Sequence, residues 1–308
     1  MYNFIIKAGG GTDAEAMKVG ISKVMTVLAV IGTLMLIICF LTTKERIIPK
    51  PEQKSSLKED LGDLFQNKPW VIILTVTTLI FITLALKGGS YVYYFETYVD
   101  KAELTAFLEP FKTFLPTFEN DTSLGLGVFN GGGILVGLIG IMISPWFANR
   151  WGKRNVFMAS LLIATVFIIL FYFFPPKSIA IIFAAQVLHG FFYGINTPIL
   201  WTMIADVADY SEWKNNRRAT AIIFSAMMVG LKAGLSIGSS LVSWILGRYG
   251  YVPQSTSGQT EAAITGTKML VSIYPAIPFL LAIALLFFYE INKKMEVQIE
   301  TELKQRRS

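Results

Sequence analysis

The stretch Gln186–Ser240, QVLHGFFYGINTPILWTMIADVADYSEWKNNRRATAIIFSAMMVGLKAGLSIGSS, predicts two membrane-crossing helices joined by a charged turn. The second apolar run lasts from about Ala219 to Leu246, and at a rise of about 1.5 Å per residue it is long enough to cross the hydrocarbon core. Lys232 then lies close to the bilayer midplane, too deep for its amine to reach either surface. We therefore interpret Lys232 as a substrate-binding residue, with a lysine neutralised by packing as the alternative.

The helix that carries Lys232 has two distinct faces. Ser236 follows Lys232 by one helical turn, so the two residues share a polar stripe that we expect to line a cavity. Glycines recur every four residues on the opposite side, at Gly230, Gly234 and Gly238, a pattern typical of close helix contact. One face is therefore predicted to pack against a neighbouring helix and the other to meet a solute.

The preceding helix carries a second polar stripe at membrane depth. Its members recur at helical spacing and join the candidate substrate-binding residues: Gln186, His189, Tyr193, and Asn196 or Thr197. Trp201 lies one turn further on, and its indole is suited to stacking on the apolar face of a sugar ring. The alternatives are a hydrogen-bonded core side chain for His189, the single histidine, and an interfacial or packing role for Trp201.

Acidic and basic residues crowd the turn between these two helices. They are Asp206, Asp209, Glu212, Arg217 and Arg218. Carboxylates and guanidinium groups at a moving interface can hold a gate shut and separate on opening, so we predict a gate at this turn. The alternative is a set of solvated loop charges, each of little energetic consequence.

The composition is that of an all-α polytopic membrane protein. Of the 308 residues, 53% are hydrophobic and 16% are charged, and apolar runs of membrane-spanning length recur. Besides the two helices above, we predict spans at about 24–41, 70–94, 125–147, 155–174 and 268–289, and a short helix in the loop 96–123. Pro275 and Pro278 predict a bend in the last span. Lys87, toward the far end of the second span, is expected to reach the interface.

Charge and cysteine usage narrow the possible functions. The net charge of +6 is spread over loops between apolar runs and forms no single basic face, which argues against a nucleic-acid partner. The single cysteine, Cys39, excludes an intrachain disulfide and a cysteine metal cluster, and we predict no metal site in this chain. One histidine and one cysteine on different spans, without an acidic pair at membrane depth, also argue against an enzyme.

The distribution of basic residues predicts the topology. About seventeen Lys and Arg residues lie in the stretch 42–70, the turns 150–154 and 214–218, and the tail, whereas the opposite loops hold about four. By the positive-inside rule the first group faces the cytoplasm. The chain would then start outside, with seven spans and no signal peptide, so we expect further sequence upstream.

Two motifs carry a resemblance to known families. PWFANRWGKRN, Pro145–Asn155, resembles the loop signature of the major facilitator superfamily, with Asn149 where an acid is usual. ADVADYSEWKNNRRATAIIFSAMMVGLKAG, Ala205–Gly234, resembles the hallmark of the glycoside, pentoside and hexuronide cation symporters, the melibiose permease group. LTTKER, NKPW, YYFETYV and RYGYVP are similar to further pieces of that family, in the same order.

The resemblance implies a major facilitator fold of twelve helices, in which two six-helix bundles enclose a sugar site near midplane. It divides this chain into the start and last helix of the N-terminal bundle (1–43), a central cytoplasmic linker (44–69), the six-helix C-terminal bundle (70–292) and a cytoplasmic tail (293–308). The first five helices are expected upstream. The partners implied are membrane lipid, a sugar or glycoside, and this missing N-terminal bundle.

The function implied is sugar (glycoside or oligosaccharide) symport with Na+ or H+ by alternating access, in a bacterial inner membrane. No cofactor is implied, and the carboxylates that bind the coupling cation are expected in the first bundle. Lys232 matches a lysine beside the sugar and cation sites of the family, whereas Met228 replaces a threonine one turn earlier. The alternatives are a lysolipid or other organic-solute carrier of the same fold, and a non-transporting membrane subunit.

Overall fold

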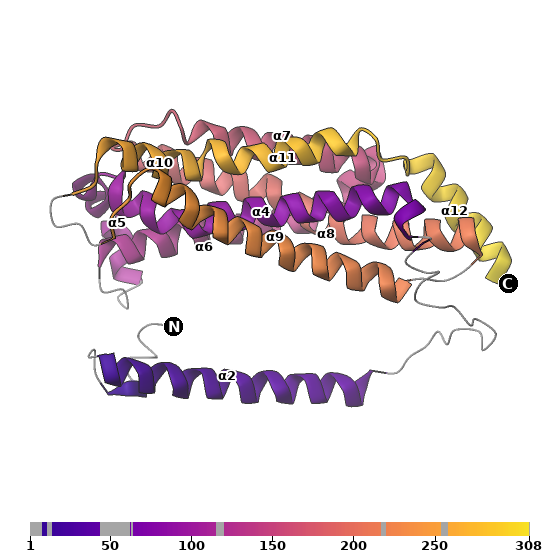
Figure 1. Ribbon diagram of the computed structural model, residues 1–308, viewed down its shortest axis with the longest axis horizontal. Coiled ribbons are helices and arrows are strands. Elements are labelled where there is room, and N and C mark those ends of the chain that lie inside the picture. The colour runs from indigo at the N-terminus through magenta and orange to yellow at the C-terminus, as the bar shows by residue number, and fades with distance from the viewer. Residues whose placement is uncertain are drawn as a thin grey trace. The chain divides into compact units, whose positions relative to one another are not determined.

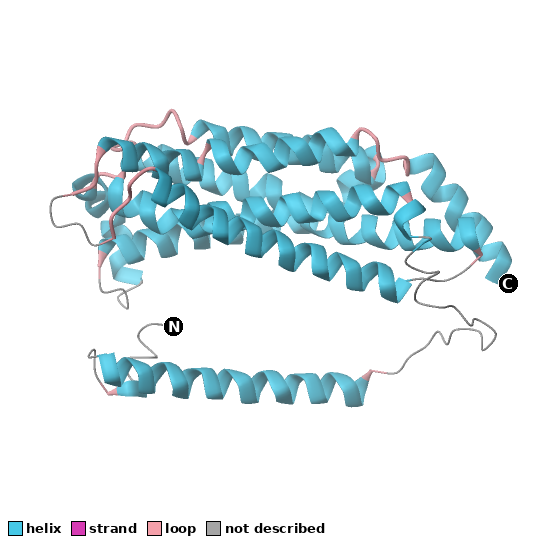
Figure 2. Ribbon diagram, in the orientation of Figure 1, coloured by secondary structure: helices cyan, strands magenta, loops and turns pink. Residues whose placement is uncertain are grey.

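Figure 1 shows the chain as a computed structural model that describes residues 8–10, 14–43, 62, 64–114, 120–216, 220–253 and 258–307. This described part consists of helices and the loops that join them, and it contains no β-strand (Figure 2). The chain divides into two compact units, Met1–Gln53 and Lys54–Ser308, each of which is treated by itself. Most of the predicted linker, including 44–61, lies outside the described residues.

The first unit contains α2 (Ala14–Thr42), a helix whose apolar side chains are largely exposed. Leu36 and Phe40 are among the most exposed of them. An apolar helix of this length fits a membrane environment, in which lipid tails solvate such side chains. The span predicted at 24–41 is therefore confirmed as a helix long and apolar enough to cross a membrane.

The second unit is a bundle of long helices joined by short connections. They are α4 (Lys68–Thr97), α5 (Lys101–Phe114), α6 (Asp121–Trp151), α7 (Lys153–Leu170), α8 (Ile179–Asn215), α9 (Thr220–Arg248), α10 (Glu261–Val271), α11 (Ile273–Leu286) and α12 (Lys293–Arg307). With α10 and α11 counted as one span, the described chain has seven segments long and apolar enough to cross a membrane. These seven coincide with the seven predicted spans, and α5 confirms the helix predicted in the loop 96–123.

Local sequence explains where several helices begin. The side chain of Asn67 accepts a hydrogen bond from the Trp70 amide, with Pro69 in the first turn of α4. Asn120 caps α6 in the same way through the Ser123 amide, and Thr260 caps α10. Each cap satisfies an amide that the first turn of a helix leaves without a partner.

The last span is broken where the sequence predicts a bend. The helix is interrupted at Ser272, between α10 and α11, and Pro275 follows in the first turn of α11. Pro275 and Pro278 lack the amide hydrogens that would continue the ladder. The Thr83 hydroxyl of α4 donates to the Pro275 carbonyl at 2.8 Å, so the broken region is tied to the neighbouring helix.

Glycine stripes allow two pairs of helices to approach closely. A Cβ on Gly190 or Gly194 of α8 would clash with the α6 backbone at Gly133 or Gly137, respectively. On α9, Gly230, Gly234 and Gly238 face α4, where added Cβ atoms would meet its atoms from Leu74 to Ala85. The predicted close contact of the α9 stripe is therefore confirmed, and α6 and α8 approach each other in the same way.

The basic segments of the second unit lie together at one end of its helix bundle. The turn between α6 and α7, the end of α8, the start of α9 and all of α12 gather at one end of the bundle (Figure 1). This end, which we call the basic end, contains the turn 150–154 and the residues 214–216 and 293–307, which belong to segments that the positive-inside rule assigns to the cytoplasm. The α9–α10 connection and α5 lie at the opposite end.

Candidate functional site

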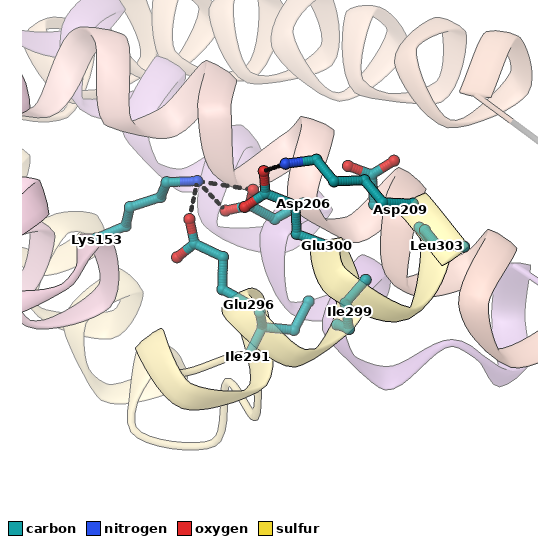
Figure 3. Close-up of a pocket in the computed structure, with 9 residues that line it drawn as sticks. Lys153, Asp206, Asp209, Ile291, Glu296, Ile299, Glu300 and Leu303 are labelled. Carbon is teal, nitrogen blue, oxygen red and sulfur yellow. Dashed lines mark hydrogen bonds and ion pairs between the residues drawn. The ribbon is translucent and has the colours of Figure 1, made fainter. Parts of the chain in front are cut away.

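Three charged side chains from three helices meet at the basic end of the bundle. The Nζ atom of Lys153, the first residue of α7, lies 2.7 Å from both carboxylate oxygens of Asp206 on α8. The same atom lies 2.8 Å from a carboxylate oxygen of Glu296 on α12 (Figure 3). All three side chains are partly buried, which reduces solvent screening of the two ion pairs. One ammonium group thus links α7, α8 and α12.

A cavity of about 340 Å³ adjoins this charged group. Its lining includes the three charged residues themselves, two further acids, Asp209 and Glu300, and Lys304. The buried aliphatic side chains of Ile291, Ile299 and Leu303 complete the lining (Figure 3). Glu300 pairs with Lys304 at 2.6 Å on the exposed surface of α12. The cavity is therefore lined by four carboxylates and two ammonium groups, and ion pairs among them link α7, α8 and α12 within this bundle.

Main-chain carbonyls at the ends of the helices bind two further cations of this region. Arg154 donates to the Phe287 carbonyl at 2.8 Å, and Lys293 donates to the carbonyl of Asn149. Gly152, with a φ of 84°, makes the sharp turn between α6 and α7 that precedes Arg154. The motif Pro145–Asn155 is thus fastened to the α11–α12 connection, and Asn149 serves through its backbone where the family usually has an acid.

α12 is held against the end of α8 by polar contacts as well as by its apolar face. The Trp213 indole donates to Glu302 at 2.6 Å, which lowers the pKa of that carboxyl. Arg306 donates to the Trp213 carbonyl at 2.9 Å and to the Asn216 side chain at 2.7 Å. Ile299 and Leu303 are buried in the main core, so the tail helix belongs to the bundle.

The structure gives the predicted gate residues different positions. Asp206 pairs with Lys153 of the preceding helix, while Asp209 lines the cavity and Glu212 is partly buried near the end of α8. Arg217 and Arg218 lie outside the described residues. Sequence reasoning did not identify Lys153 and Glu296 as partners of Asp206. The available signal was the position of Lys153 within the loop motif.

The polar stripe of α8 meets protein partners inside the bundle. The Tyr91 hydroxyl of α4 donates to Gln186 Oε1 at 2.9 Å, and the Asn196 amide group lies 2.8 Å from the Ser160 hydroxyl. His189 is buried, with its Nδ1 atom 3.0 Å from the Ala164 carbonyl. A carbonyl only accepts, so Nδ1 carries the hydrogen in this contact. These three members of the predicted substrate set lie against α4 and α7.

The remaining predicted residues of α8 are more accessible. Tyr193 stacks between the rings of His189 and Phe279, with centroids 6.0 and 6.1 Å away. Thr197 is partly buried, and Trp201 is exposed. The stripe predicted as one surface therefore consists of buried side chains with hydrogen-bond partners and, between and after them, more accessible ones.

Lys232 and Ser236 are both exposed on α9. The glycines at 230, 234 and 238 occupy the other side of the helix, against α4, as the sequence predicts. Within the described residues, no hydrogen bond or ion pair joins Lys232 to another side chain. The structure thus brings Lys232 and Ser236 onto one open face and separates both from the buried polar groups of α8.

Lys87 is a second lysine at membrane depth, and its buried position was not predicted from the sequence. Lys87 of α4 is only 7% exposed, so the expectation that it reaches the interface is wrong. Its ammonium group lies 5.6 Å from the centroid of the Tyr91 ring. Across the part of the chain that the structure covers, it has no hydrogen bond or ion pair. The helix turns this residue toward the bundle, and depth along the helix does not fix that rotation.

Fold and charge pattern together define a multi-pass α-helical membrane protein with a charged cluster at one end of its bundle. Residues 3–293 match the family described as MFS/sugar transport protein, and the chain belongs to this family. The resemblance to the major facilitator superfamily and its glycoside/cation symporters is thereby confirmed.

Several curated relatives are similar over most of the chain. The inner membrane symporter YicJ of Escherichia coli is 30% identical over 84% of this chain and 51% of its own length. The putative glycoside/cation symporter YagG of the same species is 28% identical over 93% and 57%. The isoprimeverose transporter of Lactiplantibacillus pentosus is 29% identical over 97% and 57%. A more distant relative, 25% identical, is named a putative 2,3-dihydroxypropane-1-sulfonate exporter. The chain spans just over half the length of these relatives.

Proposed function

We propose that this chain forms the C-terminal part of a sugar (glycoside or oligosaccharide):cation symporter of a bacterial inner membrane, which works by alternating access. Family membership and the names of YagG and the isoprimeverose transporter support the substrate class, and the name of YicJ supports symport at an inner membrane. The shares of 51% to 57% of those relatives support a partner bundle of further helices. In this proposal residues 1–43 close the N-terminal bundle, 44–69 link the bundles, 70–292 form the second bundle and 293–308 are the tail.

The observation that carries the proposal is the position of Lys232. Its ammonium group lies near the middle of α9, on a face that the bundle leaves open. An ammonium group in contact with acyl chains at this depth costs about 2.5–3.5 kcal/mol even by insertion scales. A hydrated compartment between two bundles removes that cost and gives the charge a solute to bind.

The candidate substrate residues take two roles in this proposal. Those on accessible surfaces contact the sugar: Lys232, Ser236, Trp201, Tyr193 and Thr197. The buried members, Gln186, His189 and Asn196, hold neighbouring helices through the hydrogen bonds described above. The coupling cation, Na+ or H+, binds carboxylates of the other bundle.

The charged cluster at the basic end serves as part of the inner gate. Lys153, Asp206 and Glu296 fix the ends of α7, α8 and α12 relative to one another. Asp209 and Glu212 then belong to the surface that meets the first bundle when the inner side closes, and the gate roles of Arg217 and Arg218 stay predictions from the sequence. Rigid rocking of one bundle against the other needs helix ends that move as a unit.

Uptake measurements test the proposal. Cells that express this chain together with a polypeptide supplying the first five helices should accumulate a labelled glycoside, and Lys232→Ala should abolish accumulation while membrane insertion stays normal. Lys294→Ala is the matched control, because it removes the same charge from an exposed position of α12, and it should retain uptake. Undiminished accumulation by the Lys232→Ala variant would contradict a role of Lys232 in substrate binding and would indicate a packing role.

The second candidate function is transport of a different solute, or export in place of uptake. The relative named as a sulfonate exporter favours it. Trp201 distinguishes the two, because an indole exposed beside the solute compartment reports a sugar that stacks on it. A sugar-dependent change in Trp201 fluorescence, absent in Trp201→Phe, supports the glycoside. A response only to an organic sulfonate or a lysolipid supports the alternative.

A further inference from the structure

A groove of about 550 Å³ lies between α9 and α11, at the opposite end of the bundle from the charged cluster. Its floor is apolar and buried, made by Leu86 of α4, Ile245 of α9 and Pro278 of α11. Its two rims are apolar but open, because Trp244 is 63% exposed and Ile277 is 48% exposed. All these residues belong to segments long and apolar enough to cross a membrane, where lipid hydrocarbon chains can enter an open apolar groove.

The polar groups of the groove gather at one end of it. Arg248 is the last residue of α9, and Tyr249 and Tyr274, whose hydroxyls lie 2.9 Å apart, line the same groove. α9 approaches this end as α11 leaves it, so Leu241 and Pro278 lie deeper in the membrane than Arg248 and Tyr274. The groove therefore has a cationic, hydroxyl-bearing mouth and an apolar body.

Arg248 is exposed, and its guanidinium group lies 5.9 Å from the Trp244 ring centroid. Among the residues that the structure describes, no carboxylate or other hydrogen-bond acceptor contacts it. A guanidinium group has five donors in a planar fork that matches phosphate oxygens. The charge at the mouth is thus complementary to a phosphate, and the apolar body is complementary to an acyl chain.

We propose that this groove binds one anionic phospholipid of the predicted outer leaflet, with its phosphate at Arg248 and the tyrosine hydroxyls and an acyl chain along Leu241, Ile245 and Ile277. An aromatic belt alone would place tryptophan and tyrosine at the interface without selecting a headgroup. The groove adds a cation at its mouth and a hollow apolar floor. The proposal depends on the chain crossing a membrane and holds whether or not the chain transports a sugar.

Fluorescence quenching by brominated lipids tests the proposal on the full chain. The chain is reconstituted in phosphatidylcholine vesicles that contain increasing fractions of brominated phosphatidylglycerol or brominated phosphatidylcholine. The Trp244 signal is the difference between the wild type and Trp244→Phe. It should be half quenched at an about fivefold lower fraction of the anionic lipid, the preference expected for one arginine at an anionic headgroup.

Variants identify the group responsible. Arg248→Gln should give equal quenching by both lipids, and Arg248→Lys should keep most of the preference. The matched control is Arg150→Gln, because Arg150 lies 5.7 Å from the Trp151 ring at the basic end and should leave the Trp244 signal unchanged. Equal quenching by the two lipids in the wild type, or an unchanged preference in Arg248→Gln, overturns the proposal. Absence of quenching by either lipid also overturns it, because protein then covers the groove.

Discussion

Lys87 places an ammonium group inside the helix bundle of the second unit, where it lies over the Tyr91 ring. A cation–π contact compensates only part of the desolvation of such a charge. We predict that Lys87→Met stabilises the bundle by about 2 kcal/mol, somewhat less than the about 2.5–3.5 kcal/mol that a central lysine costs a membrane helix. Thermal or denaturant unfolding in detergent measures the difference.

Lys294→Met is the control for this measurement, because Lys294 is exposed on α12 and the same substitution there removes no buried charge. Its effect should stay within about 0.5 kcal/mol. A Lys87→Met variant that unfolds more readily than the wild type would show that the lysine stabilises its surroundings and would contradict this account.

Asp206 connects α8 to α7 at the basic end, because both of its carboxylate oxygens accept hydrogen bonds from the ammonium group of Lys153. Removing one partner of a charge-assisted pair changes the equilibrium between the paired and the separated arrangement by about tenfold or more. We predict that Asp206→Asn slows uptake about tenfold and changes the sugar concentration for half-maximal binding less than twofold. The reason is that the helix ends at the gate lose their fixed arrangement while the solute compartment is untouched.

Glu300→Gln is the matched control, because Glu300 lines the same cavity but pairs with Lys304 on the exposed surface of α12. Exposed pairs of this kind contribute little, so its uptake should resemble that of the wild type. Equal uptake rates in the wild type and Asp206→Asn would contradict the proposal that this charged cluster is part of the inner gate.

At the scale of elements, the sequence predicts the spans and the glycine faces well, because both follow from periodicity within one helix. The bend at Ser272 was also predictable, because Pro275 and Pro278 lack amide hydrogens, which is a local property of the sequence. The ion pairs of Lys153 with Asp206 and Glu296 were not predictable, since they join residues far apart along the chain. The buried contacts of Gln186 and His189 depend on which neighbour their helix face meets, and a single sequence does not contain that information.

At the scale of the whole bundle, backbone contact between α6 and α8 fixes how the helices assemble. A Cβ on Gly194 would clash with the Gly137 backbone, which cannot move aside as a flexible side chain can. Gly194→Ala is therefore expected to destabilise the bundle by about 3 kcal/mol, at the upper end of the usual cost of overpacking. The yield of monodisperse protein and its unfolding temperature in detergent provide the measurement.

Gly131→Ala is the control on α6, because a Cβ there would have no neighbour within 4 Å. It should be neutral or slightly stabilising, since alanine favours the helix by up to about 1 kcal/mol over glycine. Similar stability of the two variants would mean that the close approach of α6 and α8 does not control assembly.

The central claim is that Lys232 faces a water-filled solute compartment, and thiol accessibility tests it most directly. Lys232→Cys is compared with Val166→Cys, an exposed position of α7 at a similar depth from the basic end, in Cys39→Ser chains assembled with a first bundle. A membrane-impermeant thiol reagent should modify position 232 at least about tenfold faster, because the reactive thiolate requires water, and glycoside should slow it. Equally slow modification at both positions would place Lys232 against lipid and contradict the account.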